Sequence, residues 1–281
     1  MEEQIVSKNI VDYSKLCIHT ITTKPWPIEQ TIENYAANGV KGITVWFQSI
    51  ENHKPEEVGK AIRAHNLEVV SMCRGGFFAS TDSSIRVKSI DENLRYIDQA
   101  AQLGAPLVVL VCGADPGQSL EQSRYQIEMG IEQILSRAVE NRVKLAIEPL
   151  HPMYADIRSA INTLKQANDV CMKFDSSFLG VVVDVYHLWW DPDLETQIKR
   201  SGQMDKLFAF HLSDWKTPTR DILNDRGLMG EGCIPINKIR SWMESSGFTG
   251  YHEVEIFSER YWKIDQFNFL ENIKKAYLTV C

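Results

Sequence analysis

Residues of metal-ligand and acid–base type follow four apolar segments in the second half of the chain. Glu148 comes directly after VKLAI, Asp184 after VVV, and His211 lies within FAFHLSD. Glu255 lies in YHEVEIF, with Glu253 two residues before it. A carboxylate at the end of a buried strand needs a partner, because moving a bare charge out of water costs several kcal/mol.

The spacing of these residues indicates that they occupy equivalent positions in a repeated unit. The successive intervals from Glu148 to Asp184, His211 and Glu255 are 36, 27 and 44 residues. One strand-and-helix unit of a barrel takes about 31 residues, so one such residue recurs per unit at the same height. Three carboxylates and an imidazole that converge on one point are typical ligands of a divalent cation. The sequence therefore predicts a metal site.

Two glutamates of the last segment compete for the fourth ligand position. Glu253 and Glu255 share a face, because alternate residues of a strand point the same way. Glu255 stands where the strand ends, before Phe257, whereas Glu253 lies one pleat deeper. Either could be the ligand, with Glu253 otherwise a partner inside the barrel. His252 points the other way and is interpreted as structural.

Eight short β-rich runs, each followed by a segment of helical period, must position these residues. The runs are almost continuously apolar, as in parallel strands covered on both faces. Eight such units indicate an α/β fold with one closed (β/α)₈ barrel over residues 1–281, because no linker divides the chain. The predicted strands are Leu16–Ile21, Gly42–Phe47, Leu67–Cys73, Pro106–Cys112, Val143–Pro149, Gly180–Asp184, Leu207–Ser213 and Tyr251–Phe257. The predicted helices lie around Pro27–Asn38, Pro55–His65, Ser84–Leu103, Leu120–Asn141, Ile157–Cys171, Leu194–Ser201, Pro235–Ser246 and Asp265–Leu278.

The composition excludes several classes of protein. The chain has 281 residues, 44% hydrophobic and 24% charged, as in ordinary globular proteins. Its net charge of −7 disfavours nucleic acid as a partner. The N-terminus MEEQIVSKNI lacks signal-peptide features, and no apolar run approaches the ~20 residues of a membrane span. We therefore expect a cytoplasmic protein without a membrane partner, whose six scattered cysteines are reduced thiols.

The motifs IEP, VxxDxxH, HxxD, GEG and EIF, in this order, resemble those of the sugar isomerase/epimerase superfamily with a xylose-isomerase-like TIM barrel. Its members include hydroxypyruvate isomerase, ketose 3-epimerases and inosose dehydratase. The resemblance covers the last four strands well and the first half only by architecture. It implies one divalent ion, Mn, Mg or Co with Zn as a further candidate, and it favours Glu255 over Glu253. The implied ligands are Glu148, Asp184, His211 and Glu255.

The resemblance also implies substrate contacts. His187, three residues after Asp184, matches a substrate-binding histidine. Arg226 in DRGLMGEG matches an arginine of the loop after strand seven loosely, while Thr217 and Arg220 lie nearer the usual spacing. His19 and Trp46, near the ends of the first two strands, are further candidates. Homo-oligomers are also common among such barrels.

Aromatic and basic residues after the strands could shape the pocket. Aromatic rings could form a floor on which a sugar stacks. Arg74, Lys216 and Arg220 could neutralise an acidic group, but we interpret them as surface charges and expect an unphosphorylated sugar or glycoside. The aromatic candidates are Trp46, Phe47, Phe77, Phe78, Trp189, Trp190 and Trp215.

The function predicted from these features is a divalent-metal-dependent sugar isomerase or epimerase. The metal would stabilise the enediolate formed when the proton α to a carbonyl leaves, and Glu148 and Glu255 would remove and return protons. The same enolisation would also support a lyase or dehydratase reaction on a keto-inositol or a 3-keto-glycoside. The sequence leaves these outcomes open.

Two functions of other classes fit less well. An endonuclease IV-like nuclease needs histidines after strands three and four, where the chain reads SMCRGG and VLVCGAD. His19 is the only candidate histidine from the first half of the chain. A non-catalytic sugar-binding barrel would not need the intact ligand set.

Overall fold

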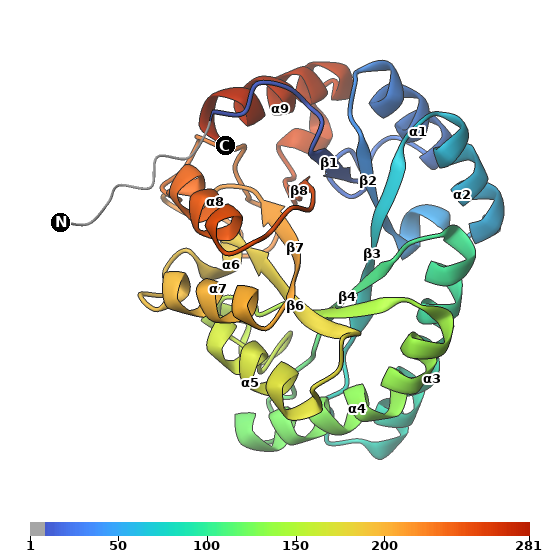
Figure 1. The fold of residues 1–281 in the computed structure, drawn as a ribbon, viewed down its shortest axis with the longest axis vertical. Helices are drawn as coiled ribbons and strands as arrows, with labels where there is room; N and C mark the ends of the chain where they lie inside the picture. Colours follow the sequence, from blue (N-terminus) through green and yellow to red (C-terminus); the bar gives the residue numbers. More distant parts are fainter. Residues whose placement is uncertain (1–8) are drawn as a thin grey trace.

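The computed structural model describes residues 9–281. Eight parallel strands form the centre of the molecule, and helices surround them (Figure 1). The strands pair in chain order, and β8 pairs back with β1 to close the barrel. The predicted single (β/α)₈ architecture is thereby confirmed. The acidic N-terminal stretch that argued against a signal peptide lies mostly outside the described residues.

The strands form at the predicted runs because these runs are rich in Val, Ile and Leu and can be buried on both faces. Within the described residues, register shifts interrupt the pairing in β2–β3, β3–β4 and β6–β7. The strands are β1 (Leu16–His19), β2 (Gly42–Trp46), β3 (Glu68–Gly76), β4 (Leu107–Val111), β5 (Lys144–Ile147), β6 (Leu179–Asp184), β7 (Leu207–Leu212) and β8 (His252–Val254).

One predicted helix begins later than expected. The segment 157–163 is loop, and the helix starts at Leu164 because Thr163 and Gln166 form a capping box at its N-terminus. The α-helices are α1 (Ile28–Ala37), α2 (Pro55–Ala64), α3 (Ser83–Leu103), α4 (Leu120–Asn141), α5 (Leu164–Phe174), α6 (Val185–Leu188), α7 (Leu194–Gln203), α8 (Ile236–Ser245) and α9 (Gln266–Val280). Short 3₁₀ turns are η1 (Phe47–Ile50), η2 (Pro152–Tyr154) and η3 (Tyr261–Lys263).

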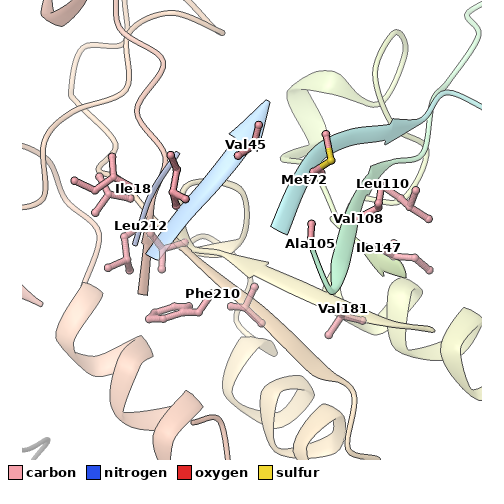
Figure 2. Close-up of a cluster of buried hydrophobic side chains, with 14 of the residues drawn as sticks. Ile18, Val45, Met72, Ala105, Val108, Leu110, Ile147, Val181, Phe210 and Leu212 are labelled. Atoms are coloured by element: carbon pink, nitrogen blue, oxygen red, sulfur yellow. The ribbon is translucent and has the colours of Figure 1, made fainter. Parts of the chain in front are cut away.

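Two apolar layers hold the barrel together. The larger lies between strands and helices, and Figure 2 shows part of it, including Val181 and Phe210. The smaller cluster contains the neighbouring residues Val182 and Ala209 together with Ala146, and it fills the barrel interior. Alternate residues of a strand point to opposite sides. The residues two positions after these interior ones therefore also point inward, and they are the residues of the predicted site.

Two further expectations concern the chain as a whole. All six cysteines are free, and five of them are buried. Among the residues that the structure describes, no helix is long and apolar enough to cross a membrane.

Candidate active site

The carboxyl ends of β5 to β8 bring together the four predicted ligand residues. Glu148 directly follows β5, Asp184 ends β6, His211 is next to last in β7, and Glu255 directly follows β8. One ligand atom from each lies within 4.8 Å of all the others. All four side chains are buried. The cluster therefore has the composition and the compactness of a metal site.

The donor atoms of this cluster fit a divalent ion. His211 Nδ1 lies 2.9 Å from Glu148 Oε1, within ion-pair distance, although the contact does not have hydrogen-bond geometry. Two ligands about 2.1 Å from an ion and at right angles to each other lie about 3 Å apart. Buried polar atoms are normally hydrogen-bonded, so this pair without hydrogen-bond geometry indicates donors that are set up for a cation.

Arg226 supplies positive charge beside the cluster. Its NH1 group donates hydrogen bonds to Asp184 Oδ2 at 3.0 Å and to Glu255 Oε2 at 2.7 Å. Burial alone would raise the pKa of Glu255, but Arg226 and His19 hold it well below its usual range. Thr217 and Arg220 are exposed, so the structure places Arg226, rather than either of them, in the site.

Burial and neighbouring charges also shift the other groups. Burial raises the pKa of Asp184 to about 7. Burial would lower the pKa of His211, but the carboxylates of Glu148, Glu253 and Glu255 raise it to about 10. The His211 ring is therefore protonated at neutral pH when no metal is bound, and a metal ion would have to displace that proton.

His187 lies next to Arg226 in the pocket. Its Nε2 atom is 3.0 Å from NH2 of Arg226, and its Nδ1 accepts a hydrogen bond from the backbone N–H of His151 at 3.3 Å. Burial and the charge of Arg226 lower the pKa of His187 well below its usual range. The ring is thus neutral and fixed in place, and its contact with a substrate stays a prediction.

Trp46 and His19 occupy different positions relative to the pocket. Trp46 lines the pocket and donates a hydrogen bond from Nε1 to His19 Nδ1 at 3.2 Å. The same His19 atom lies 3.2 Å from Glu255 Oε1. His19 is fully buried behind Glu255 and is not among the pocket-lining residues. This position suits support of Glu255 better than the predicted substrate contact.

Glu253 lies deeper in the barrel and is surrounded by hydroxyl groups. Its Oε2 atom accepts hydrogen bonds from Thr44 Oγ1 at 2.6 Å and from Ser71 Oγ at 3.0 Å, with His19 Nε2 3.3 Å away. It is absent from the four-residue cluster, in keeping with a role inside the barrel. His252 points outward, where its Nδ1 lies 2.9 Å from the hydroxyl of Tyr277 on α9.

A pocket lies directly above the cluster. The space left between its side chains is only about 20 Å³, enough for one water molecule. Tyr154 donates a hydrogen bond to the carbonyl of Ile222, so the loop after β7 is fastened across the mouth. A sugar is larger than this space, so its entry requires the lining side chains or this loop to move. The lining residues are Trp46, Arg74, Val111, Glu148, Leu150, Tyr154, Arg158, His187, Leu223, Arg226, Glu255 and Phe257.

Several predicted wall residues lie elsewhere. Phe47 stacks on Tyr96 with ring centroids 3.9 Å apart, and Phe78 is buried in the outer core. Trp189 and Trp215 pack against each other beside the pocket rather than lining it, and Trp190 is also outside the lining. Phe77, under Arg74, is likewise not a lining residue. Among the predicted rings, only Trp46 faces the pocket.

The pocket also contains residues that the sequence analysis missed or misread. Tyr154 and Arg158 lie in and after a 3₁₀ turn, in a stretch without periodicity. Phe257 could have been found, because it follows Glu255 by two positions and so shares its face. Arg74 lines the pocket, so its interpretation as a surface charge was wrong.

The fold and the site together have the arrangement of an active site in a barrel enzyme. Comparison with known proteins gives the family of the chain. The chain belongs to the xylose isomerase-like TIM barrel family, whose model matches residues 32–276. An inosose isomerase of Bacillus licheniformis is 25% identical over 209 residues, which are 73% of each chain. An L-ribulose-5-phosphate 3-epimerase of Salmonella typhi is 22% identical over 71% of this chain and 68% of its own.

Solved structures agree with this assignment. A protein of Sinorhizobium meliloti is 40% identical, with a TM-score of 0.92 over 96% of this chain and 99% of its own. A crystal structure of the IolI protein with a bound zinc atom is 21% identical, with a TM-score of 0.83 over 95% and 97% of the two chains. The second likeness shows the shared fold.

Proposed function

We propose that this chain is a divalent-metal-dependent enzyme that isomerises or epimerises a sugar by moving a proton next to a carbonyl group. The observation that carries the proposal is the cluster of four buried ligand residues, in which His211 Nδ1 and Glu148 Oε1 lie 2.9 Å apart without hydrogen-bond geometry. The names of the curated relatives, an inosose isomerase and a ketose 3-epimerase, support the same class of reaction.

The four cluster residues Glu148, Asp184, His211 and Glu255 would hold the ion. The zinc atom in the IolI structure supports a metal at such a site, and the ligand types suit Mn, Mg, Co or Zn. When bound, the ion supplies a Lewis acid that polarises the carbonyl and makes the neighbouring C–H more acidic.

Glu148 and Glu255 are the groups placed to move protons. Both line the pocket, whereas Asp184 and His211 do not. They come from β5 and β8, so they approach a bound sugar from different sides. Arg226 keeps Glu255 ionised and therefore able to accept a proton.

Arg226 and His187 would orient the substrate. Their side chains face the pocket and fix each other through the 3.0 Å contact. Trp46 and Phe257 meet edge to face with centroids 5.1 Å apart and form an apolar wall beside them. A preorganised polar group next to an apolar wall is the usual composition of a small-ligand site.

A lyase or dehydratase reaction is the second candidate. Expulsion of a β leaving group would use the same proton abstraction by Glu148 or Glu255. A 3-dehydroshikimate dehydratase of Pseudomonas aeruginosa, 22% identical over 83% of this chain and 36% of its own, favours keeping this outcome. The cytoplasmic location, the homo-oligomer and the absence of a nucleic-acid partner stay predictions from the sequence.

Deuterium exchange tests the proposal directly. Manganese-loaded protein is incubated in D₂O with ketoses, ketose phosphates, keto-sugar acids, keto-inositols and 3-keto-glycosides, and NMR follows the carbon next to the carbonyl. We expect label to enter at least one substrate with the wild-type protein and far more slowly with Glu148→Gln. Exchange with none of them, or equal exchange with Glu148→Gln, would contradict the proposal.

A further inference from the structure

Two arginines in the pocket have no acidic partner. Arg74 lies in β3 and Arg158 follows η2, and both line the same pocket as Glu148 and Arg226. Within residues 9–281, no ion pair or side-chain hydrogen bond joins either guanidinium to another residue. The Nε atom of Arg74 is buried and has no hydrogen-bond partner. Both side chains are partly buried, and arginines withdrawn from water are normally paired, so these two require explanation.

The two guanidinium groups are held with their N–H edges free. Arg74 lies over the ring of Phe77 at 4.3 Å, and Arg158 lies 5.7 Å from the ring of Tyr154. These contacts cover a face of each cation and leave its donors without partners. Burial, together with the charge of Arg158, lowers the pKa of Arg74 to about 10. The two cations thus repel each other across a partly desolvated pocket.

The backbone presents Arg74 in a fixed position. Gly76, two residues later, has φ of +104°, and a Cβ atom there would meet the carbonyl oxygen of Val111 at 2.0 Å. Gly75 and Gly76 pair in register with Leu110 and Val111 of β4. The backbone that directly follows Arg74 is therefore fixed by the sheet, and rigid support of this kind is typical of a preorganised ligand group.

We propose that Arg74 and Arg158 form an anion-binding subsite, so that the substrate is a sugar or polyol derivative that carries an oxyanion, either a carboxylate or a phosphate. This inference rests on the proposed function, because it names the substrate class of the same pocket. Guanidinium groups bind both oxyanions with paired, charge-assisted hydrogen bonds. A bound anion would supply the missing donor partners and remove the repulsion between the two cations. A phosphate as the oxyanion would differ from the expectation of an unphosphorylated sugar or glycoside, whereas a carboxylate would agree with it.

Arg226 shows what a satisfied arginine looks like in this pocket. It donates to two carboxylates, Asp184 and Glu255, and its pKa is raised above its ordinary value in spite of burial. The pKa of Arg74 and that of Arg158 are shifted in the opposite direction, chiefly by burial. The three arginines therefore divide into one that belongs to the catalytic cluster and two that await an external anion.

A matched set of polyols tests this subsite without any turnover. Calorimetric titration of the manganese-loaded protein compares D-glucitol, D-gluconate and D-glucitol 1-phosphate, which differ only in the group at C1. We expect at least one anion to bind about tenfold or more tightly than glucitol. The preference should fall to within about threefold in Arg74→Met and in Arg158→Met, and Arg74→Lys should retain part of it. Whether gluconate or the phosphate binds more tightly identifies the oxyanion.

The control is Arg137→Met, an exposed arginine on α4 that pairs with Asp98. This variant should keep the wild-type preference. Equal binding of all three polyols, no measurable binding of either anion, or a preference that survives in both pocket variants would overturn the subsite. Deuterium exchange into a neutral ketose combined with equal polyol binding would remove the subsite and leave the proposed function standing. Anion preference without any exchange would do the reverse.

Discussion

Two glutamates on the last strand, two residues apart, occupy contrasting layers of the barrel interior. In the deeper layer, the Glu253 carboxylate accepts hydrogen bonds from hydroxyl groups of β2 and β3. In the upper layer, Glu255 contacts Arg226 and His19 and opens onto the pocket. The difference indicates that a carboxylate held by hydrogen bonds from fixed hydroxyl groups has a structural role. A carboxylate held by charges at a pocket remains available for chemistry.

The largest effect that would test this contrast is on proton transfer. Glu148→Gln and Glu255→Gln should each lower kcat by roughly 10²–10⁴-fold, because each amide keeps the shape and loses the base. Metal content should remain largely unchanged, as measured by elemental analysis. Glu253→Gln should do much less. If Glu253→Gln abolished substrate exchange and Glu255→Gln did not, the assignment of the two layers would be reversed.

Stability should show the opposite ranking of the two glutamates. Glu253→Leu removes the acceptor of Thr44 and Ser71 and leaves His19 beside an apolar group, so we expect a loss of about 3–5 kcal/mol in the free energy of unfolding. Glu255→Leu should lose less, because its site faces the pocket. Urea titration followed by circular dichroism measures both. Equal losses would mean that the layers do not differ in structural importance.

Metal removal should affect stability moderately. An ion present at 100 times its Kd stabilises the folded state by about 2.7 kcal/mol, so chelation should lower Tm by several degrees. Manganese or cobalt should restore it in the wild-type protein and far less in Asp184→Asn. A Tm that responds to none of Mn, Mg, Co and Zn would argue against a metal in the upper layer.

The smallest expected effect is a pH dependence of metal affinity. Because the pKa of His211 is raised to about 10 in the absence of metal, the ring carries a proton that an ion must displace at pH 7. Affinity for manganese should therefore rise as pH rises from 7 to 8, by at most about tenfold per proton released, and fall as pH is lowered. Calorimetry in buffers of different ionisation enthalpy counts the released proton. An affinity for manganese that does not change with pH would contradict the displacement of a proton from His211.

The parts of the fold and site that could be predicted from the sequence follow from one rule: successive side chains of a strand point alternately into the barrel and toward the helices. Ala146 and Glu148 differ by two positions, as do Val182 and Asp184, so an interior residue leads directly to a site residue. The rule fails for Arg74, because the register of β3 shifts between Met72 and Gly75. Alternation along the strand therefore no longer predicts on which side of the sheet its side chain lies.

The contribution of loops could not be predicted in the same way. Arg226 reaches the cluster because the chain after β7 folds back, with Asp214 and Gly227 paired in an antiparallel bridge. Spacing along the chain does not reveal such a return. Arg158 lies in a loop that the prediction merged into the following helix, and Tyr154 lies in the 3₁₀ turn just before it, since no periodic pattern marks the boundary.

The hydrogen bond from Thr44 to Glu253 spans 209 residues and ties the second strand to the last. During synthesis, the hydroxyl groups of β2 and β3 have no acceptor until the segment that carries Glu253 has left the ribosome. A polypeptide interrupted before β8 would keep β1 and β7 as open edges, which invite aggregation. It would also lack Glu255. Closure of the barrel and assembly of the site therefore coincide, and a fragment that ends before β8 has neither.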